Sequence, residues 1–184
     1  MVLDLVLIAV IVIIALFLIL VYNGLVRVNN LVKNSWSQID VQLKKRADLI
    51  PNLVETVKGY AKHERSVFKE VTEARAMMLK AQTIPQKAKA NNMLSDALKS
   101  IFAVAEAYPK LEASSNFKHL QEELSDIEGK IAYSRQFYND SVLELNNSIQ
   151  TFPNNVIAGS LGFTQKDFFE ASGEERKNVK VKFD

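Results

Sequence analysis

Residues 5–21 read LVLIAVIVIIALFLILV, an unbroken apolar run in which all but the two alanines are Leu, Ile, Val or Phe. As a helix rising about 1.5 Å per residue, the run would extend about 26 Å, close to the roughly 30 Å hydrocarbon core of a bilayer. Each such side chain near the centre favours insertion by roughly 0.3 to 0.6 kcal/mol. The run therefore predicts a transmembrane helix over residues 5–22.

A cleavable signal peptide is the competing interpretation of this run. It would carry a basic segment before the apolar residues and small residues before the cleavage site. Here Asp4 precedes the run, and Tyr22, Asn23 and Gly24 follow it. The pattern favours an uncleaved anchor, with residues 1–4 as a short exported N-terminus and Tyr22 at the membrane interface.

The flanking charges predict the orientation of the anchor. Lysine and arginine are missing before the run, whereas Arg27 and Lys33 follow it. Because basic residues stay on the cytoplasmic side, we expect a single-pass protein of the cell membrane whose C-terminal domain is cytoplasmic. The lipid bilayer is then the first expected partner.

The overall composition narrows the remaining function classes. The chain has 23 Lys and Arg against 21 Asp and Glu, and no cysteine. This balance argues against a nucleic-acid partner, because phosphate binding needs a concentrated basic surface. The densest basic run, Lys44-Lys45-Arg46, could touch lipid head groups, but a solvated helix face is the favoured interpretation. The missing cysteines exclude disulfides and thiolate metal sites.

Apolar residues recur at steps of three and four after the anchor, which predicts an all-α fold. Pro51, with Asp48 as a candidate N-cap, predicts a turn near Ala47 and a second helix from about residue 49 to 81. That helix would place Tyr60 on its apolar face. Pro85 is expected in the first turn of a third helix, which Tyr108-Pro109 closes. The first helix has its apolar face at Leu25, Val28, Val32, Trp36, Ile39 and Leu43.

The fourth predicted helix has the clearest periodicity. Long helices joined by short loops are typical of an antiparallel up-and-down four-helix bundle, which we expect over residues 23–152 with Trp36 and Leu124 in the core. The apolar positions of the fourth helix are Phe117, Leu120, Leu124, Ile127, Ile131, Tyr138, Val142, Leu145, Ile149 and Phe152.

Residues 153–184 are expected to form a short helix and a mobile charged tail. Phe163, Phe168 and Phe169 are three large aromatics on a segment too short to bury them alone. They either plug the end of their own bundle or form a contact site for assembly or partner binding. These three residues are the interaction candidates of the chain.

The sequence offers no catalytic residues, no metal ligand set and no cofactor motif. His63 and His119 lie on different predicted elements without the HExxH spacing, and no glycine-rich phosphate loop occurs. The structural polar candidates are Arg75, Arg135 and Asn139, which lie beside or within apolar faces. An arginine there either covers apolar surface with its stem, or forms an interior charge pair that fixes helix register.

Several motifs are spread over nearly the whole chain: DVQLKKRADLIPNLVETVKGYAKHE at residues 40–64, Tyr22-Asn23, Trp36, Ala74-Arg75, Ala107-Tyr108-Pro109, Phe137-Tyr138-Asn139 and Phe152-Pro153. Together they resemble those of the LemA family of bacterial proteins. The resemblance implies an N-terminal membrane helix, a cytoplasmic antiparallel helical bundle and no established enzymatic activity. One branch of the family is associated with magnetosome membrane formation, and members often occur beside membrane metalloproteases.

Two hypotheses of function follow from the anchor, the helices and the missing catalytic motifs. The first is a non-enzymatic scaffold that forms a homo-oligomer and organises membrane. The second is an adaptor or regulator that binds a membrane protein partner, such as a metalloprotease. The size of the purified protein in detergent separates them, because a scaffold assembles unaided.

Overall fold

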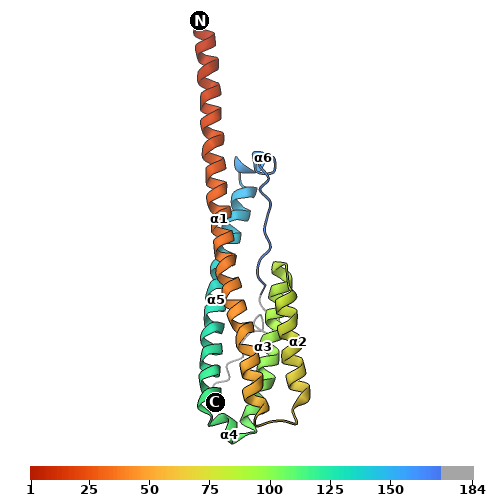
Figure 1. Cartoon of the computed structure of the whole chain (residues 1–184). Helices are drawn as coiled ribbons and strands as arrows, with labels where there is room; N and C mark the ends of the chain where they lie inside the picture. Colours follow the sequence, from red (N-terminus) through yellow and green to blue (C-terminus); the bar gives the residue numbers. More distant parts are fainter. Residues whose placement is uncertain (171–184) are drawn as a thin grey trace, which may run out of the picture. The chain divides into compact units, whose positions relative to one another are not determined.

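The structure is a computed structural model that describes residues 1–170 (Figure 1). Within this range the regular secondary structure is entirely helical, so the predicted all-α class is confirmed. The predicted tail falls largely on residues 171–184, which lie outside the described range. The helices are α1 (Val2–Lys58), α2 (Arg65–Lys80), α3 (Ile84–Glu106), α4 (Pro109–Glu112), α5 (Ser115–Gln150) and α6 (Asn154–Ile157).

The chain divides into two compact units, which are described separately below. The anchor unit consists of Met1–Ser37 and Gln136–Asp167, and the described part of the core unit consists of Gln38–Arg135 and residues 168–170. Helices α1 and α5 each contribute residues to both units. In the anchor unit, the first part of α1 is long and apolar enough to cross a membrane, and no part of that apolar window is buried. The predicted long apolar N-terminal helix is thereby confirmed.

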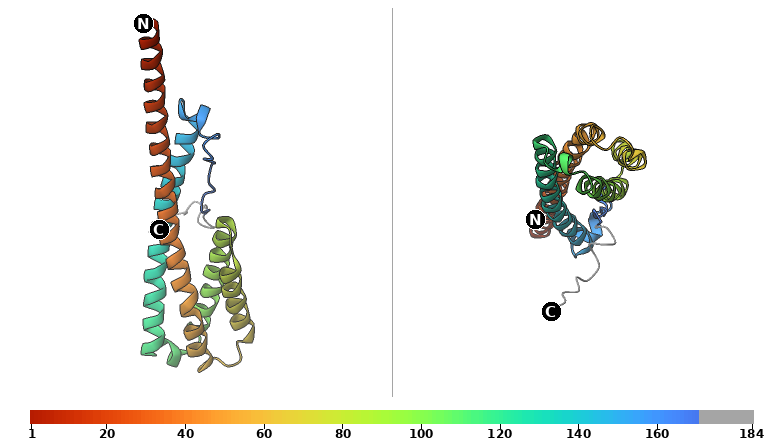
Figure 2. Two further views of the ribbon diagram at one scale, coloured as in Figure 1. Left: turned by 45° about the horizontal axis from the view of Figure 1, so that its top comes forward. Right: turned by 90° about the horizontal axis from the view of Figure 1, so that it is seen from below.

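Helices α1, α2, α3 and α5 supply most of the buried cluster of the core unit, and Leu111 of α4 also belongs to it. Helices α2 and α3 pack against each other and lie side by side in every view (Figure 2). The periodic positions predicted for α5 between Phe117 and Leu145 are buried. The cluster includes Ile50, Leu53 and Val57 of α1, Phe68, Val71 and Ala74 of α2, Leu94, Leu98 and Ile101 of α3, and Phe117, Leu120 and Leu124 of α5.

The turn predicted near Ala47 is wrong, because α1 continues through Pro51 to Lys58. Asp48 is therefore no N-cap, and the helix ends seven residues after the proline, at Lys58. The proline rule failed because Leu53, Val54 and Val57 bury their side chains in the core cluster, and this burial favours a continued helix. The predicted second helix is thus the end of α1, a loop over residues 59–64, and α2.

The start of α3 agrees with the prediction. Pro85 lies in its first turn, and Thr83 and Gln86 form a capping box in which each side chain accepts from the other residue's backbone N–H. Two predicted apolar positions are wrong: the Tyr60 side chain is 46% exposed in the loop before α2, and Phe152 is 77% exposed after α5. Both follow the last residue of a helix, where the periodicity no longer applies.

Replacement of Leu124 by Ala tests the core of the core unit. The Leu124 side chain is only 4% exposed within the shared cluster, so the cavity should lower the free energy of unfolding by roughly 2 to 5 kcal/mol. Leu143→Ala on the same helix is the control, since Leu143 is 50% exposed and its replacement should change stability by less than about 0.5 kcal/mol. Equal losses in chemical denaturation would contradict this core assignment.

Candidate functional site

Arg75 of α2 bonds to the backbone of α1 where Pro51 interrupts its hydrogen bonding. A proline has no N–H, so the carbonyl four residues earlier, that of Ala47, receives no helical bond from position 51. The Nε of Arg75 donates to this carbonyl oxygen at 2.8 Å. Ala47 is fully buried and Arg75 is partly buried, so the bond satisfies an acceptor that is shielded from water. Arg75 therefore bonds to the backbone of α1, a role that neither sequence-based alternative included.

Arg46 of α1 is the most deeply buried charged side chain among the described residues of the core unit, at 4% exposure. Its guanidinium donates to Oδ1 of Asn91 on α3 at 2.8 Å and pairs with the carboxylate of Glu128 on α5 at 2.5 Å. Burial lowers the pKa of Arg46 and the Glu128 charge partly opposes this shift. Among the described residues, the Nε of Arg46 is a buried donor without a partner.

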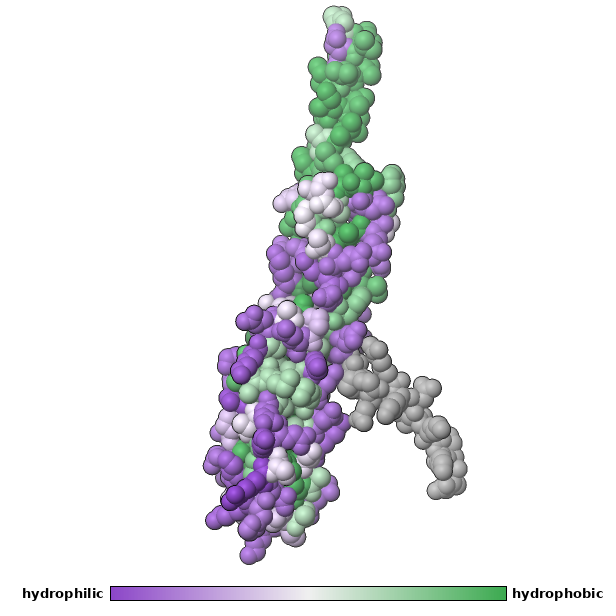
Figure 3. Space-filling model, turned by 90° about the vertical axis from the view of Figure 1, so that its right-hand side faces the viewer, coloured by the Kyte–Doolittle hydropathy of each residue, from purple (hydrophilic) through white to green (hydrophobic). Residues whose placement is uncertain are grey.

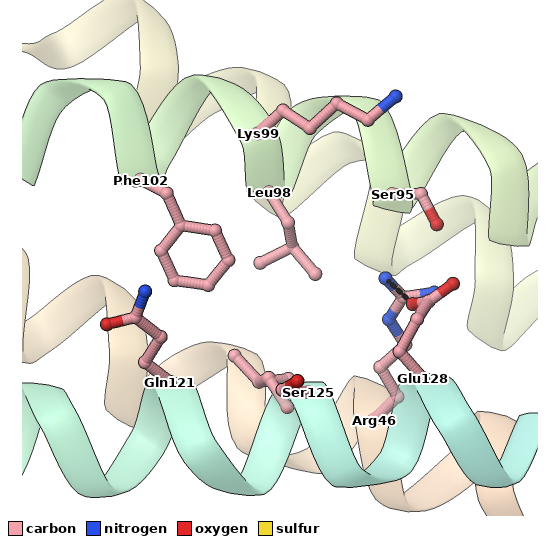
Figure 4. Close-up of a pocket in the computed structure, with 9 residues that line it drawn as sticks. Arg46, Ser95, Leu98, Lys99, Phe102, Gln121, Ser125 and Glu128 are labelled. Atoms are coloured by element: carbon pink, nitrogen blue, oxygen red, sulfur yellow. Dashed lines mark ion pairs between the residues drawn. The ribbon is translucent and has the colours of Figure 1, made fainter. Parts of the chain in front are cut away.

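A groove of about 390 Å³ lies beside this ion pair, between α3 and α5 (Figure 4). Leu98 and Phe102 of α3 give it an apolar wall, while Gln121 and Ser125 line it from α5. Arg46 and Glu128 close one end of the groove. The arrangement can hold an apolar group next to a fixed ion pair, but it presents no nucleophile held by a base.

Lys44-Lys45-Arg46 does not form the uniformly solvated face that the sequence favoured. Lys44 and Lys45 are exposed, whereas Arg46 is buried. The step of three from Leu43 and of four to Ile50 would have placed Arg46 on the apolar face, if α1 had been read through Pro51. Because a turn was predicted at Ala47, this spacing was not applied to Arg46.

In the anchor unit, the segment after α6 returns along α5 and is held there by side-chain hydrogen bonds. The hydroxyl of Tyr138 donates to the carbonyl oxygen of Asp167 at 2.8 Å. The amide of Asn146 donates to the carbonyl oxygen of Lys166 at 3.0 Å and accepts from its N–H at 2.8 Å. We call Tyr138, Asn146, Lys166 and Asp167 the clamp.

Burial shapes the chemistry of the clamp. Tyr138 is fully buried, and the ring of Trp36 stands edge-on to it with 5.6 Å between ring centroids. Burial raises the pKa of Tyr138 to about 12, and the charge of Asp167 acts in the same direction. The tyrosine therefore stays a neutral donor at any physiological pH. Trp36, predicted for the core, is only partly buried.

The structure does not gather the three predicted phenylalanines into one exposed cluster. Phe163 is partly buried with its ring edge-on to Tyr22, at a centroid distance of 6.1 Å. Phe168 is 42% exposed, and Phe169 is fully buried. Only Phe168 thus offers a large exposed apolar surface, and the role of the three in association remains a prediction.

The other predicted site residues are placed as follows. Arg135 and Asn139 on α5 are partly buried, and neither is without a partner. His63 and His119 are exposed. Across residues 1–170, no three His, Asp or Glu side chains come close enough to hold a metal ion. The sequence missed Arg46, Asn91 and the clamp, whose contacts join residues far apart in the chain.

Comparison with known proteins finds similarity to the LemA family and to magnetosome proteins. The sequence profile of the LemA family matches residues 35–183. The chain is 25% identical to magnetosome protein MamQ of Magnetospirillum gryphiswaldense, over 80% of this chain and 64% of that protein. It is 28% identical to protein LemA of Metamycoplasma hominis, over 85% of this chain and 72% of that protein. It thus spans less than two thirds of MamQ.

A double-mutant cycle tests the bond from Arg75 to Ala47. Arg75→Ala should lower the free energy of unfolding by about 1 to 3 kcal/mol, because it leaves a buried carbonyl unpaired. In a Pro51→Ala background, position 51 regains its N–H, so the same replacement should cost about 1 kcal/mol less. Lys80→Ala, an exposed cation on the same helix, should show no such coupling. Strict additivity of Arg75→Ala with Pro51→Ala would contradict the assignment.

The raised pKa of Tyr138 predicts a loss of stability in alkali. Unfolded tyrosine ionises near its ordinary value of about 10, whereas the folded side chain holds its proton until about 12, so stability falls as pH rises through this window. Two pKa units correspond to roughly 3 kcal/mol. The wild type should lose about this much relative to Tyr138→Phe, in denaturation curves recorded across the window. Tyr133→Phe, at a side chain 73% exposed, should keep the wild-type pH slope.

Proposed function

This chain belongs to the LemA family, and we propose that it is a non-enzymatic, single-pass membrane protein that self-associates and organises membrane. The observation that carries the proposal is the uncovered apolar part of α1. Its side chains include Leu7, Ile13 and Leu20, which are 62%, 65% and 72% exposed. Soluble proteins rarely expose continuous apolar patches of this kind, whereas a bilayer would cover them. Figure 3 displays this continuous hydrophobic surface along the free length of the helix.

We further propose that α1, α2, α3 and α5 form an antiparallel up-and-down bundle. The support is that all four helices contribute to one buried cluster and that short connections join them in sequence. Short connections make neighbouring helices run in opposite directions. The basic residues that follow the apolar segment, beginning with Arg27, support a cytoplasmic bundle.

A membrane-anchored protein acts as a scaffold only if it self-associates. The support for it is the exposed Phe168, together with the name of the MamQ relatives as magnetosome proteins. The groove beside Phe102 favours a second candidate function, an adaptor that binds a membrane protein partner through the core unit. An adaptor would leave the isolated protein monomeric.

The mass of the purified full chain in detergent, measured by light scattering, separates the two functions. A scaffold should give a defined assembly of several chains. Phe168→Ser should reduce this assembly while leaving the melting temperature nearly unchanged, because the residue is 42% exposed. Phe169→Ser is the structural counterpart: its side chain is fully buried, so it should cost roughly 3 to 5 kcal/mol of stability.

A single chain per micelle at all concentrations would contradict the scaffold and leave the adaptor. Orientation is tested in intact cells, where added protease should leave the chain after Tyr22 uncut if the bundle is cytoplasmic. Digestion of that part in unbroken cells would overturn the proposed orientation.

A further inference from the structure

The chain from the last turns of α5 to the residue before Lys166 of the clamp has no charged side chain. From Leu145 to Gln165 there is no Asp, Glu, Lys, Arg or His, although 24% of the whole chain is charged. A stretch of this length would be expected to carry about five charged residues at that frequency. The same region carries exposed apolar side chains: Phe152 is 77% exposed, Val156 69% and Leu161 41%.

A helix C-cap holds this segment beside the end of the apolar part of α1. Gly162 has a φ of +79°, in the left-handed region that glycine adopts without strain. The N–H of Phe163 donates to the carbonyl oxygen of Ala158 at 3.0 Å, and the N–H of Gly162 donates to that of Gly159 at 3.1 Å. This pair of bonds is the Schellman motif, which reverses the chain after the last helical turn.

The reversal brings Phe163 against Tyr22. The two rings stand edge-on with centroids 6.1 Å apart, and the α6 region lies beside α1 in Figures 1 and 2. Tyr22 is the residue at which the apolar run ends, and tyrosine is enriched at the depth of the lipid head groups. The clamp at Tyr138 and Asn146 fixes the chain that follows Phe163 on α5. The uncharged segment is therefore held level with the boundary of the span.

We propose that residues 152–163 form a second, interfacial membrane contact, which inserts Phe152, Val156 and Leu161 among the lipid head groups and upper acyl chains. This inference rests on the proposed membrane anchor, since Tyr22 marks the bilayer boundary only if α1 spans. The chemistry fits this partner: the segment combines exposed apolar side chains with uncharged Asn and Ser, and has no ion to dehydrate. A span and an interfacial segment joined in one unit would hold α1 at a fixed tilt and rotation.

The missing cysteines allow a direct test on the full chain. Single-cysteine variants Val156→Cys, Leu143→Cys and Ile13→Cys are labelled with an environment-sensitive fluorophore and reconstituted in vesicles of phosphatidylcholine and phosphatidylglycerol. Lipids carrying a nitroxide near the top of the acyl chain then quench labels at shallow depth. Leu143 is the matched control, because it is exposed on α5 in the same unit but lies about 10 Å along the helix before its last residue, Gln150.

The label at position 156 should be quenched about twofold or more above the label at 143, and the label at 13 should respond most to a nitroxide deep in the acyl chain. Quenching at 13 with equal, weak quenching at 156 and 143 would overturn the interfacial contact while leaving the anchor intact. No quenching at 13 would overturn the anchor and this inference together. Circular dichroism of each variant verifies that the helices are retained.

Discussion

The passage of α1 through Pro51 depends on a hydrogen bond from another helix. The proline removes the donor that the Ala47 carbonyl would receive, and Arg75 of α2 supplies one at 2.8 Å. Because α1 then continues to Lys58, its last turns can place Leu53 and Val57 in the cluster shared by the core unit. The same bond joins α2 to one carbonyl of α1. The missing N–H of Pro51 in α1 thus creates a contact between α1 and α2.

Periodicity in the sequence predicted the helices wherever no such defect occurs. The positions from Phe117 to Leu145 on α5 are buried as predicted, and Thr83 and Pro85 begin α3 with local capping chemistry. The end of α1 could not be predicted in this way, because the rule for proline describes an isolated helix. A distant arginine and the burial of Leu53 overrode it, and neither is visible in the local sequence.

The environments of the three C-terminal phenylalanines also could not be predicted from the local sequence. Their proximity in sequence suggested one common surface, but the structure gives them three different environments. Gly162, in the left-handed region, precedes Phe163, whose ring lies against Tyr22, and Asn146 of the clamp binds the backbone of Lys166. Glycine and asparagine are common in loops, so these residue types alone do not predict such contacts. The uncharged stretch from Leu145 to Gln165, in contrast, was visible in the sequence.

The Arg46 ion pair has a different role from that of the apolar core. Arg46 is buried while the Glu128 side chain is 46% exposed, so taking the guanidinium out of water costs about as much as the pair regains, and the Nε of Arg46 finds no partner among the described residues. Stability alone would favour an apolar side chain at this position. The guanidinium instead joins α1 to Asn91 of α3 and Glu128 of α5. A slip of α1 or α5 by a turn, about 5.4 Å, would separate the buried guanidinium from Glu128, and a slip of α3 would remove its bond to Asn91. Apolar side chains tolerate such slips more easily, so we interpret Arg46 as the residue that selects one register of the three helices.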